Sequence, residues 1–174
     1  MTERGPVEVT NLDQYGHPPL PWSRARDGLA AGQAGHEIAY FLCTTRPDGH
    51  PHAAGIGALW HDDDLYFVSG PETRKSRNLA ANSACTIAAH MDNLDLVLDG
   101  TASRIVDRPT LERLASAYRN VGWPVDVEGN AFTAPYTAPS GGPPPWHLYR
   151  FTLETAVGVG GEDPGGATRW RFAR

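Results

Sequence analysis

Residues 73–78, Thr-Arg-Lys-Ser-Arg-Asn, bring together the side chains of this sequence that are best suited to hold an anion. The preceding apolar residues 65–69 predict a strand, and Gly70-Pro71 predicts the turn at which a short helix begins, at about Glu72. The basic residues then lie in or near the first helical turn, beside unpaired backbone N–H groups and the positive end of the helix dipole. Cations are unfavourable there unless an anion binds among them, so the segment is a candidate phosphate site.

The spacing within this segment supports the same chemistry. Arg74, Arg77 and Asn78 are three and four positions apart and therefore share one helix face. Lys75 reaches the same edge and is the only lysine among the 15 lysine and arginine residues of the chain. Because the composition is biased against lysine, the single lysine suggests a position that needs a compact ammonium and does not fit a planar guanidinium. The alternative is a solvated basic helix face.

A second unusual segment is the predicted strand 52–60, which is rich in small residues. Its centre reads Ala54, Gly55, Ile56, Gly57 and Ala58. Small side chains weaken a strand and often mark the close approach of a ligand or of another backbone. A tight bend of a barrel is the alternative explanation.

The composition of the chain limits the classes of protein to which it can belong. A chain of 174 residues with 40% hydrophobic and 20% charged residues indicates one globular domain, with an N-terminal arm and helix at 1–35 and the main domain at 36–174. The net charge of −5 argues against nucleic-acid binding, and no apolar run approaches the roughly 20 residues of a membrane span. Cys43 and Cys85 lie in apolar runs and read as buried thiols. With no signal-peptide pattern, we expect a cytoplasmic protein.

The pattern of elements predicts a mainly β fold of the α+β type. Residues 1–20 read as an extended arm, and residues 22–34 as a helix with Ser23 as a possible cap. Asp48-Gly49 predicts a hairpin, and residues 123–145 form a long loop. The remaining strands are expected at 37–45, 84–91, 95–106, 146–154, 155–160 and 168–172, with a helix at 109–120. Six or seven antiparallel strands with two or three helices indicate a closed or partly closed barrel.

At this point the sequence resembles the pyridoxamine 5′-phosphate oxidases. The run Phe67-Val-Ser-Gly-Pro-Glu-Thr-Arg-Lys is similar to their flavin-phosphate segment, and the hairpin Pro-Asp-Gly-His-Pro-His before it also fits. The resemblance covers residues 36–107 well and the C-terminus loosely. Pro-Pro-Leu-Pro-Trp at 18–22 and Gly-Ala-Thr-Arg-Trp-Arg-Phe at 166–172 are similar to actinobacterial flavin/deazaflavin oxidoreductases.

The resemblance implies a split β-barrel, that is, an FMN-binding, Greek-key antiparallel barrel with flanking helices. It implies a homodimer with two cofactor sites at the subunit interface and FMN, the deazaflavin F-420 or haem as cofactor. It assigns the phosphate to Thr73, Arg74 and Lys75 with support from Asn78, and places Ser69 near the ribityl chain. The backbone and small side chains of residues 54–58 would lie along the isoalloxazine edge. Trp170 and Arg171 would reach the site of the partner subunit.

The expected activity follows from the cofactor. A flavin or deazaflavin moves hydride to or from a bound substrate, and the protein positions the two, so no catalytic side chain is expected. We expect F-420 rather than FMN, because its oligoglutamate tail needs additional cations that Arg77, with Arg24 or Arg26, can supply. The substrate would be a small unsaturated organic molecule. The C-terminal Arg-Leu-x-Pro type ending of the true oxidases is absent, which argues against oxidation of pyridoxamine phosphate.

Other interpretations stay open at the level of sequence. His50 and His52 share a strand face, but no further ligands complete a metal set. A histidine-ligated haem is a runner-up from another class, and a cofactor carrier without turnover is a third. The aromatic residues at 22, 123, 136, 146 and 170 either line a substrate pocket or form the core of a dimer interface, which is the simpler explanation.

Overall fold

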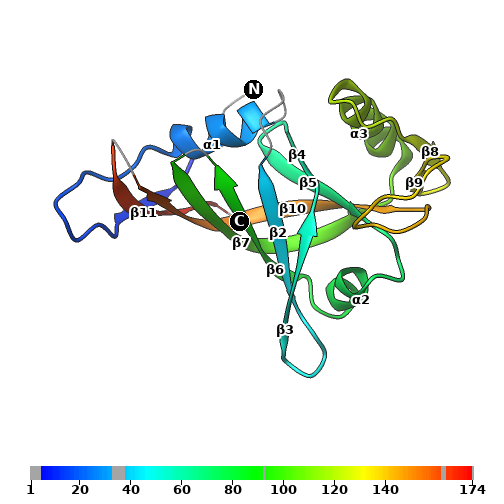
Figure 1. Cartoon of the computed structure of the whole chain (residues 1–174), viewed down its shortest axis with the longest axis horizontal. Coiled ribbons are helices and arrows are strands. Elements are labelled where there is room, and N and C mark those ends of the chain that lie inside the picture. The colour runs from blue at the N-terminus through cyan, green and yellow to red at the C-terminus, as the bar shows by residue number, and fades with distance from the viewer. Residues whose placement is uncertain (1–4, 33–37, 92, 162–163, 174) are drawn as a thin grey trace.

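The computed structural model describes residues 5–32, 38–91, 93–161 and 164–173. Figure 1 shows a strongly curved antiparallel sheet with helices against it. The strands are β1 (Glu8–Asn11), β2 (Ala39–Thr45), β3 (Pro51–Ile56), β4 (Ala58–His61), β5 (Asp64–Ser69), β6 (Ala84–Met91), β7 (Leu94–Ile105), β8 (Asp126–Glu128), β9 (Ala131–Thr133), β10 (His147–Gly160) and β11 (Gly166–Arg171). The helices are α1 (Trp22–Ala31), α2 (Arg74–Ala81) and α3 (Arg108–Asn120).

Strand β10 is the centre of the nine-stranded sheet, whose main path runs β1-β11-β10-β7-β6-β2-β3. It pairs with β7 along its length, with β5 through its first part and with β11 through its last. The register with β7 shifts between Leu153 and Thr155, which is a β-bulge that bends the strand. The sequence predicted two strands that meet between residues 154 and 155, and the structure has a single strand with the bulge at that position.

The sheet curls back on itself at Gly57. The chain leaves the edge strand β3, turns at Gly57 and enters β4, which pairs with β5. The predicted return strand 52–60 is therefore two strands joined at a bend. Within the described residues the hydrogen-bonded path ends at β3, so the barrel is curled rather than closed.

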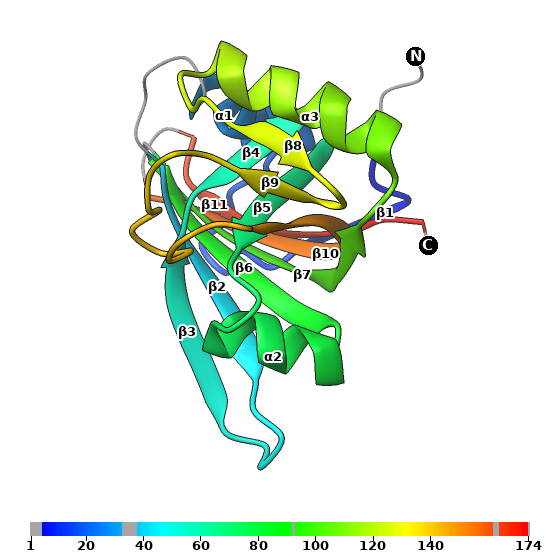
Figure 2. The ribbon, with the colours of Figure 1, turned by 90° about the vertical axis from the view of Figure 1, so that its right-hand side faces the viewer.

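Two clusters of apolar side chains form the core. The larger one lies inside the curl, where α1 adds Trp22, Ala25 and Leu29. The second lies under α3, around Leu111 and Phe132. The three helices occupy different sides of the sheet: α3 and α1 lie towards the top of Figures 1 and 2, and α2 at the bottom.

Several local expectations need correction. The N-terminal arm is not wholly irregular, since β1 pairs with β11. Pro21, not Ser23, precedes α1 as its cap residue, and no side-chain cap bond forms. The 123–145 loop contains the β8–β9 hairpin. The expected helix end at 34 and the domain boundary at 35/36 lie outside the described residues. In the ranges that are described, no helix is both long and apolar enough to cross a membrane.

Candidate functional site

Three hydroxyl groups build the junction between β5 and α2. Thr73 caps the helix, since its Oγ1 accepts the Ser76 backbone N–H at 3.3 Å. Ser69 Oγ lies 2.7 Å from Thr73 Oγ1 and accepts from Ser76 Oγ at 2.8 Å. The helix thus begins at Arg74, two residues later than expected, because the cap is Thr73. Ser69 is fully buried in this network, so it sets the strand-to-helix angle and has no free hydroxyl towards solvent.

Lys75 is the most unusual cation of the chain. It is only 4% exposed, and its Nζ donates to the carbonyl oxygen of Ser140 at 2.5 Å. None of the ion pairs formed by the described residues gives it a carboxylate partner. Burial lowers the pKa of Lys75. A buried ammonium held only by a carbonyl group is costly, and a bound anion would compensate it.

Asn78 ties α2 to the sheet from the same buried face. Its Nδ2 donates to Thr44 Oγ1 on β2 at 2.9 Å, whereas its Oδ1 is buried and has no partner in the described chain. Turning the amide over exchanges the two ends, with Thr44 then donating, so one polar end stays unpaired in either orientation. An unpaired buried group costs about 1–3 kcal/mol, which marks this spot as one where a ligand or water atom belongs.

The residue that the sequence analysis undervalued is His52, which it weighed as a metal or haem ligand. His52 lies on β3 directly opposite Thr44, the residue that α2 contacts through Asn78. Burial first, and then the charges of Arg46, Arg74 and Lys75, lower the pKa of His52. The imidazole therefore belongs to one cluster of basic side chains with Arg46, Arg74 and Lys75. It lies there because β3 pairs with β2.

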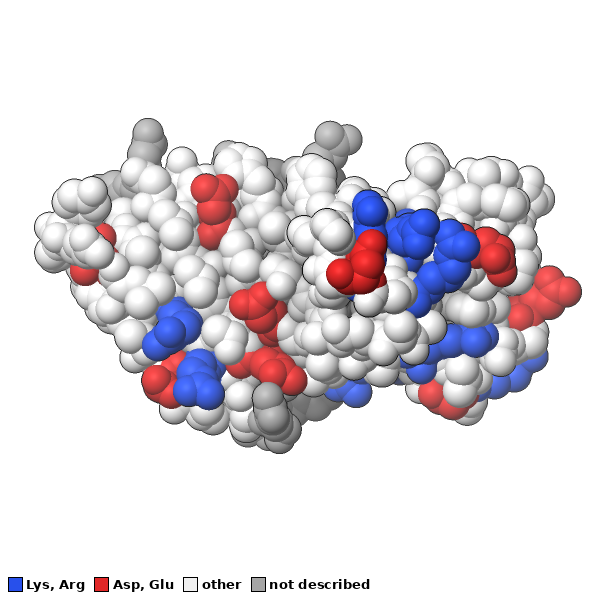
Figure 3. All heavy atoms as spheres, turned by 90° about the horizontal axis from the view of Figure 1, so that it is seen from below, with Lys and Arg blue, Asp and Glu red and all other residues white. Residues whose placement is uncertain are grey.

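The two arginines of α2 do not share the buried face of Lys75. Arg74 and Arg77 are exposed, as is Arg46 on the β2–β3 turn. No hydrogen bond or ion pair of the described residues engages any of these three guanidinium groups. Figure 3 shows that Lys and Arg side chains gather over the end of the molecule that carries α2. Unpartnered guanidinium groups beside a buried ammonium form a suitable anion site.

The small-residue segment offers an open strand edge. Among the described strands, β3 pairs only with β2, so no described strand engages the polar backbone groups along its other edge, which could bind a planar ligand. A Cβ atom built on Gly55 or Gly57 would meet no described atom within 4 Å. Ala54 and Ile56 face the opposite side of β3 from Gly55 and are more buried. The backbone and the space that a flat ring system needs are therefore present.

Gly57 and Ala58 also line a cavity of about 870 Å³. Its walls come from the start of β2, the bend between β3 and β4, the end of α3 and residues 138–140. Tyr40, Tyr118 and Trp123 contribute aromatic surface, and no charged side chain is among the described residues that line it. Ser140, whose carbonyl binds Lys75, belongs to the same wall, so the cavity adjoins the cation cluster.

The structure does not bring Trp170 to this site, and the expectation for its side chain needs correction. Trp170 is 1% exposed and packs edge-on against Trp22 with ring centroids 5.5 Å apart. An indole in the core cannot contact a cofactor of either subunit. Arg171 is exposed and lies 3.4 Å from Glu8. Strands β10, β7, β6 and β2 separate it from β3, so Arg171 does not lie at the β3 strand of its own chain.

Arg24 and Arg26 are also far from the cluster. Arg24 donates to the carbonyl oxygens of Pro164 and Asn93, at 2.6 and 2.8 Å. Asn93 follows the end of β6 that is remote from α2, and Arg26 pairs with Asp27. Figures 1 and 2 agree that α1 and α2 lie at opposite ends of the molecule. These two arginines therefore cannot extend the anion site of their own chain.

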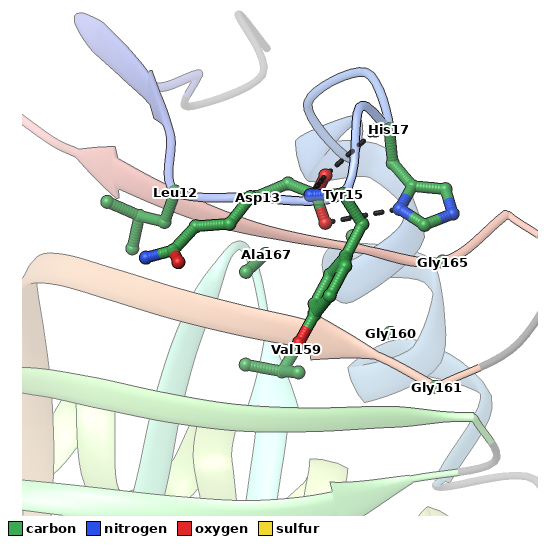
Figure 4. Close-up of a pocket in the computed structure, with 11 residues that line it drawn as sticks. Leu12, Asp13, Tyr15, His17, Val159, Gly160, Gly161, Gly165 and Ala167 are labelled. Atoms are coloured by element: carbon green, nitrogen blue, oxygen red, sulfur yellow. Dashed lines mark hydrogen bonds and ion pairs between the residues drawn. The ribbon is translucent and has the colours of Figure 1, made fainter.

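A second cavity, of about 660 Å³, lies between residues 12–17 and the β10–β11 end of the sheet (Figure 4). Asp13 accepts the backbone N–H groups of Tyr15 and His17, and its Oδ1 lies 3.1 Å from His17 Nδ1. These contacts fold the arm into a turn and engage both oxygens of the Asp13 carboxylate. None of the expected site residues lines this cavity. Among the described residues, no group of three or more His, Cys, Asp or Glu side chains is placed to hold a metal ion.

Comparison with known proteins agrees with this geometry. Residues 33–155, more than half of the chain, match the family described as pyridoxamine 5′-phosphate oxidase. The chain belongs to this family. The match contains the α2 junction, both strands of the β2–β3 hairpin and all the described residues that line the larger cavity except Gly32. No curated protein matches the sequence.

Solved structures show the same fold at low sequence identity. A conserved hypothetical protein from Mycobacterium tuberculosis is 14% identical over 91% of this chain and 89% of that one, with a TM-score of 0.57. A pyridoxamine 5′-phosphate oxidase-related, FMN binding protein from Nostoc punctiforme PCC 73102 is 14% identical, covers 89% and 98%, and has a TM-score of 0.56. A heme binding protein from Mycobacterium smegmatis is 15% identical, covers 82% and 57%, and has a TM-score of 0.55. The expected split β-barrel class is confirmed.

Proposed function

We propose that this protein is an oxidoreductase that binds a flavin-type cofactor, with the cofactor phosphate beside the N-terminus of α2. The observation that carries the proposal is the buried ammonium of Lys75, which has no acidic partner in the described chain and which acts, with Arg46 and Arg74, on the unpartnered ring of His52. A phosphate carries nearly two negative charges and binds best to convergent cations and N–H donors. The family supports the same class of ligand.

Different groups of the chain then bind different parts of the cofactor. Lys75 and Arg74 hold the phosphate, Thr73 fixes the helix end, and Asn78 braces α2 against β2. The free edge of β3 and the space beside Gly55 and Gly57 receive the ring system. When bound, the cofactor supplies hydride transfer.

The lining of the cavity beside the β3–β4 bend supports a proposal for the class of substrate. Its described lining is apolar and aromatic and carries no charged side chain, which favours a small uncharged organic molecule, such as an unsaturated one. The described lining has no cation for a substrate phosphate, which agrees with the expectation that pyridoxamine phosphate is not oxidised here.

The geometry supports FMN and F-420 equally. The sequence argument for F-420 relied on Arg24 or Arg26 in addition to Arg77, and those two arginines lie at the other end of the molecule. Arg77 alone remains beside Arg74 to receive a negatively charged tail. A direct comparison of the two cofactors therefore decides between them.

A homodimer completes the proposal. The outer face of the sheet exposes Phe41 by 50%, Val97 by 39% and Val159 by 47%. Phe41, Ala88, Val97 and Val157 lie side by side in one register row across β2, β6, β7 and β10. A continuous apolar row on an exposed sheet face fits a second copy of the chain.

The test is an equilibrium titration of the cofactor-free protein with FMN and with F-420, followed by tryptophan fluorescence. Trp123 lines the cavity, so a bound ring quenches it, and a Trp123→Phe variant should lose that part of the quenching. Saturable binding of either cofactor supports the proposal and names the cofactor. If neither binds and haem does, the oxidoreductase proposal is wrong and a haem-binding function replaces it.

A further inference from the structure

We propose that His52 is a ligand of the anion site and takes up a proton when the phosphate binds, an inference that rests on the phosphate position of the proposed function. Nothing in the family match assigns this residue a role. The proposal makes the affinity for the cofactor depend on pH through one side chain of the β2–β3 hairpin.

The first support is the position of the ring. His52 and Thr44 are direct partners across β2 and β3, and such partners project from the same face of a sheet. Thr44 Oγ1 accepts from Asn78, so that face is the one that α2 covers. The imidazole therefore points towards the helix end that carries Lys75 and not towards the outer face.

The second support is that the ring has no partner. His52 Nδ1 is shielded from solvent, and neither ring nitrogen forms a hydrogen bond with a described residue. The ion pair of this hairpin joins His50 to Asp48 instead, at 3.2 Å. Only a protonated imidazole has two N–H donors, which is the form that an anion selects. A half-buried histidine with an unpaired ring is thus ready for a ligand that only its charged form binds well.

The third support is the sign of the surrounding charge. The charged groups that act on His52 are Arg46 from the β2–β3 turn and Arg74 and Lys75 from α2, and all three are cations. Together with burial, which is the larger cause, they lower the pKa of His52. An anion placed among these cations reverses the local potential, so the pKa of His52 rises when it binds.

The consequence for binding follows from proton linkage. Between the low pKa of the free protein and the higher pKa of the complex, binding takes up one proton, and affinity rises by up to about tenfold for each unit by which pH falls. Above the pKa of the complex, His52 stays neutral and affinity is constant. At the acidic end of this pH range, where the bound state carries a protonated His52, the site therefore favours a doubly charged anion over a singly charged one most strongly.

The experiment uses inorganic sulfate as the first probe, because its charge does not change across the pH range used. NMR follows the imidazole signals of the whole protein from pH 5 to 9, with and without saturating sulfate, and His52→Gln identifies the His52 signal. The expected result is a His52 pKa below the ordinary imidazole value without sulfate and a clearly higher pKa with it. His50→Gln is the matched control, since it removes an exposed imidazole from the same hairpin, and its sulfate affinity should keep the pH dependence of the unsubstituted protein.

The second measurement titrates FMN and F-420 into the protein and into His52→Gln at pH 6, 7 and 8. The proposal expects the pH dependence to be steeper in the unsubstituted protein than in His52→Gln. It is overturned if sulfate or a cofactor binds while the His52 pKa stays fixed, or if His52→Gln keeps the same pH dependence; the proposed function then still stands. If neither cofactor binds at any pH, the proposed function fails, and this inference fails with it.

Discussion

The change from Lys75 to Met tests the anion site most sharply, because Met keeps the length of the side chain and removes its charge. Lys75 is 4% exposed and holds only the Ser140 carbonyl, so its ammonium is free to move to a phosphate. A hydrogen bond to a charged group contributes about 1.5–3 kcal/mol, which corresponds to a loss of affinity on the order of 10- to 100-fold for the cofactor that binds.

The same substitution should leave the stability of the cofactor-free protein almost unchanged. A buried ammonium without a counter-ion costs desolvation free energy, so its removal offsets the lost hydrogen bond to Ser140. We expect the free energy of unfolding of the cofactor-free Lys75→Met protein to lie within about 1 kcal/mol of the unsubstituted value. Arg113→Met is the control for net charge, because Arg113 makes an exposed pair with Asp62 on another side of the molecule.

The dependence of stability on pH provides a further check on Lys75. Burial lowers the pKa of Lys75 in the folded protein below the value of about 10.4 that applies to the unfolded chain. Between these two values the unfolded state binds more protons, so the free energy of unfolding should rise with pH, and Lys75→Met should lose that rise. Unchanged cofactor affinity in Lys75→Met, measured by titration, would refute the phosphate assignment. A loss of more than about 3 kcal/mol in stability would show instead that Lys75 is a structural residue.

Three further substitutions test other parts of the account. Phe41→Lys should convert a dimer into a monomer in sedimentation experiments, whereas Val106→Lys, at another exposed apolar position, should not; a dimer that survives Phe41→Lys contradicts the proposed interface. Gly57→Val should fold, because a Cβ there meets no described atom within 4 Å, and should weaken cofactor or substrate binding by filling the cavity mouth; unchanged binding would place the ring elsewhere. Gly70→Ala should lower the melting temperature, because its Cβ would lie 2.2 Å from the Gly141 carbonyl oxygen, and a stable variant would show that this loop is free to move.

The sequence was most informative where local chemistry decides the structure. The turn at Gly70-Pro71 and the basic helix after it are properties of adjacent residues, so the start of α2 was predictable to within two residues. That Lys75 is buried while Arg74 is exposed was not predictable, because burial depends on where α2 meets β2 and residues 138–140.

The missed features all depend on contacts between distant segments. His52 belongs to the anion site because β3 pairs with β2 in a register that sets it opposite Thr44. Trp170 was expected at a cofactor and lies in the core, because β11 pairs with β10 and turns its indole towards Trp22. One wall of the cavity is formed by residues 138–140, which carry no periodic pattern that places a loop against a strand.

The most direct test is a crystal structure of the protein with whichever cofactor binds in the titration. The account predicts phosphate oxygens within hydrogen-bond distance, about 2.7–3.2 Å, of Lys75 Nζ, with Arg74 and His52 around them and the ring along the free edge of β3. Lys75 Nζ should have turned from the Ser140 carbonyl towards the phosphate. A phosphate bound anywhere else, for example in the cavity beside Asp13, would contradict the central claim.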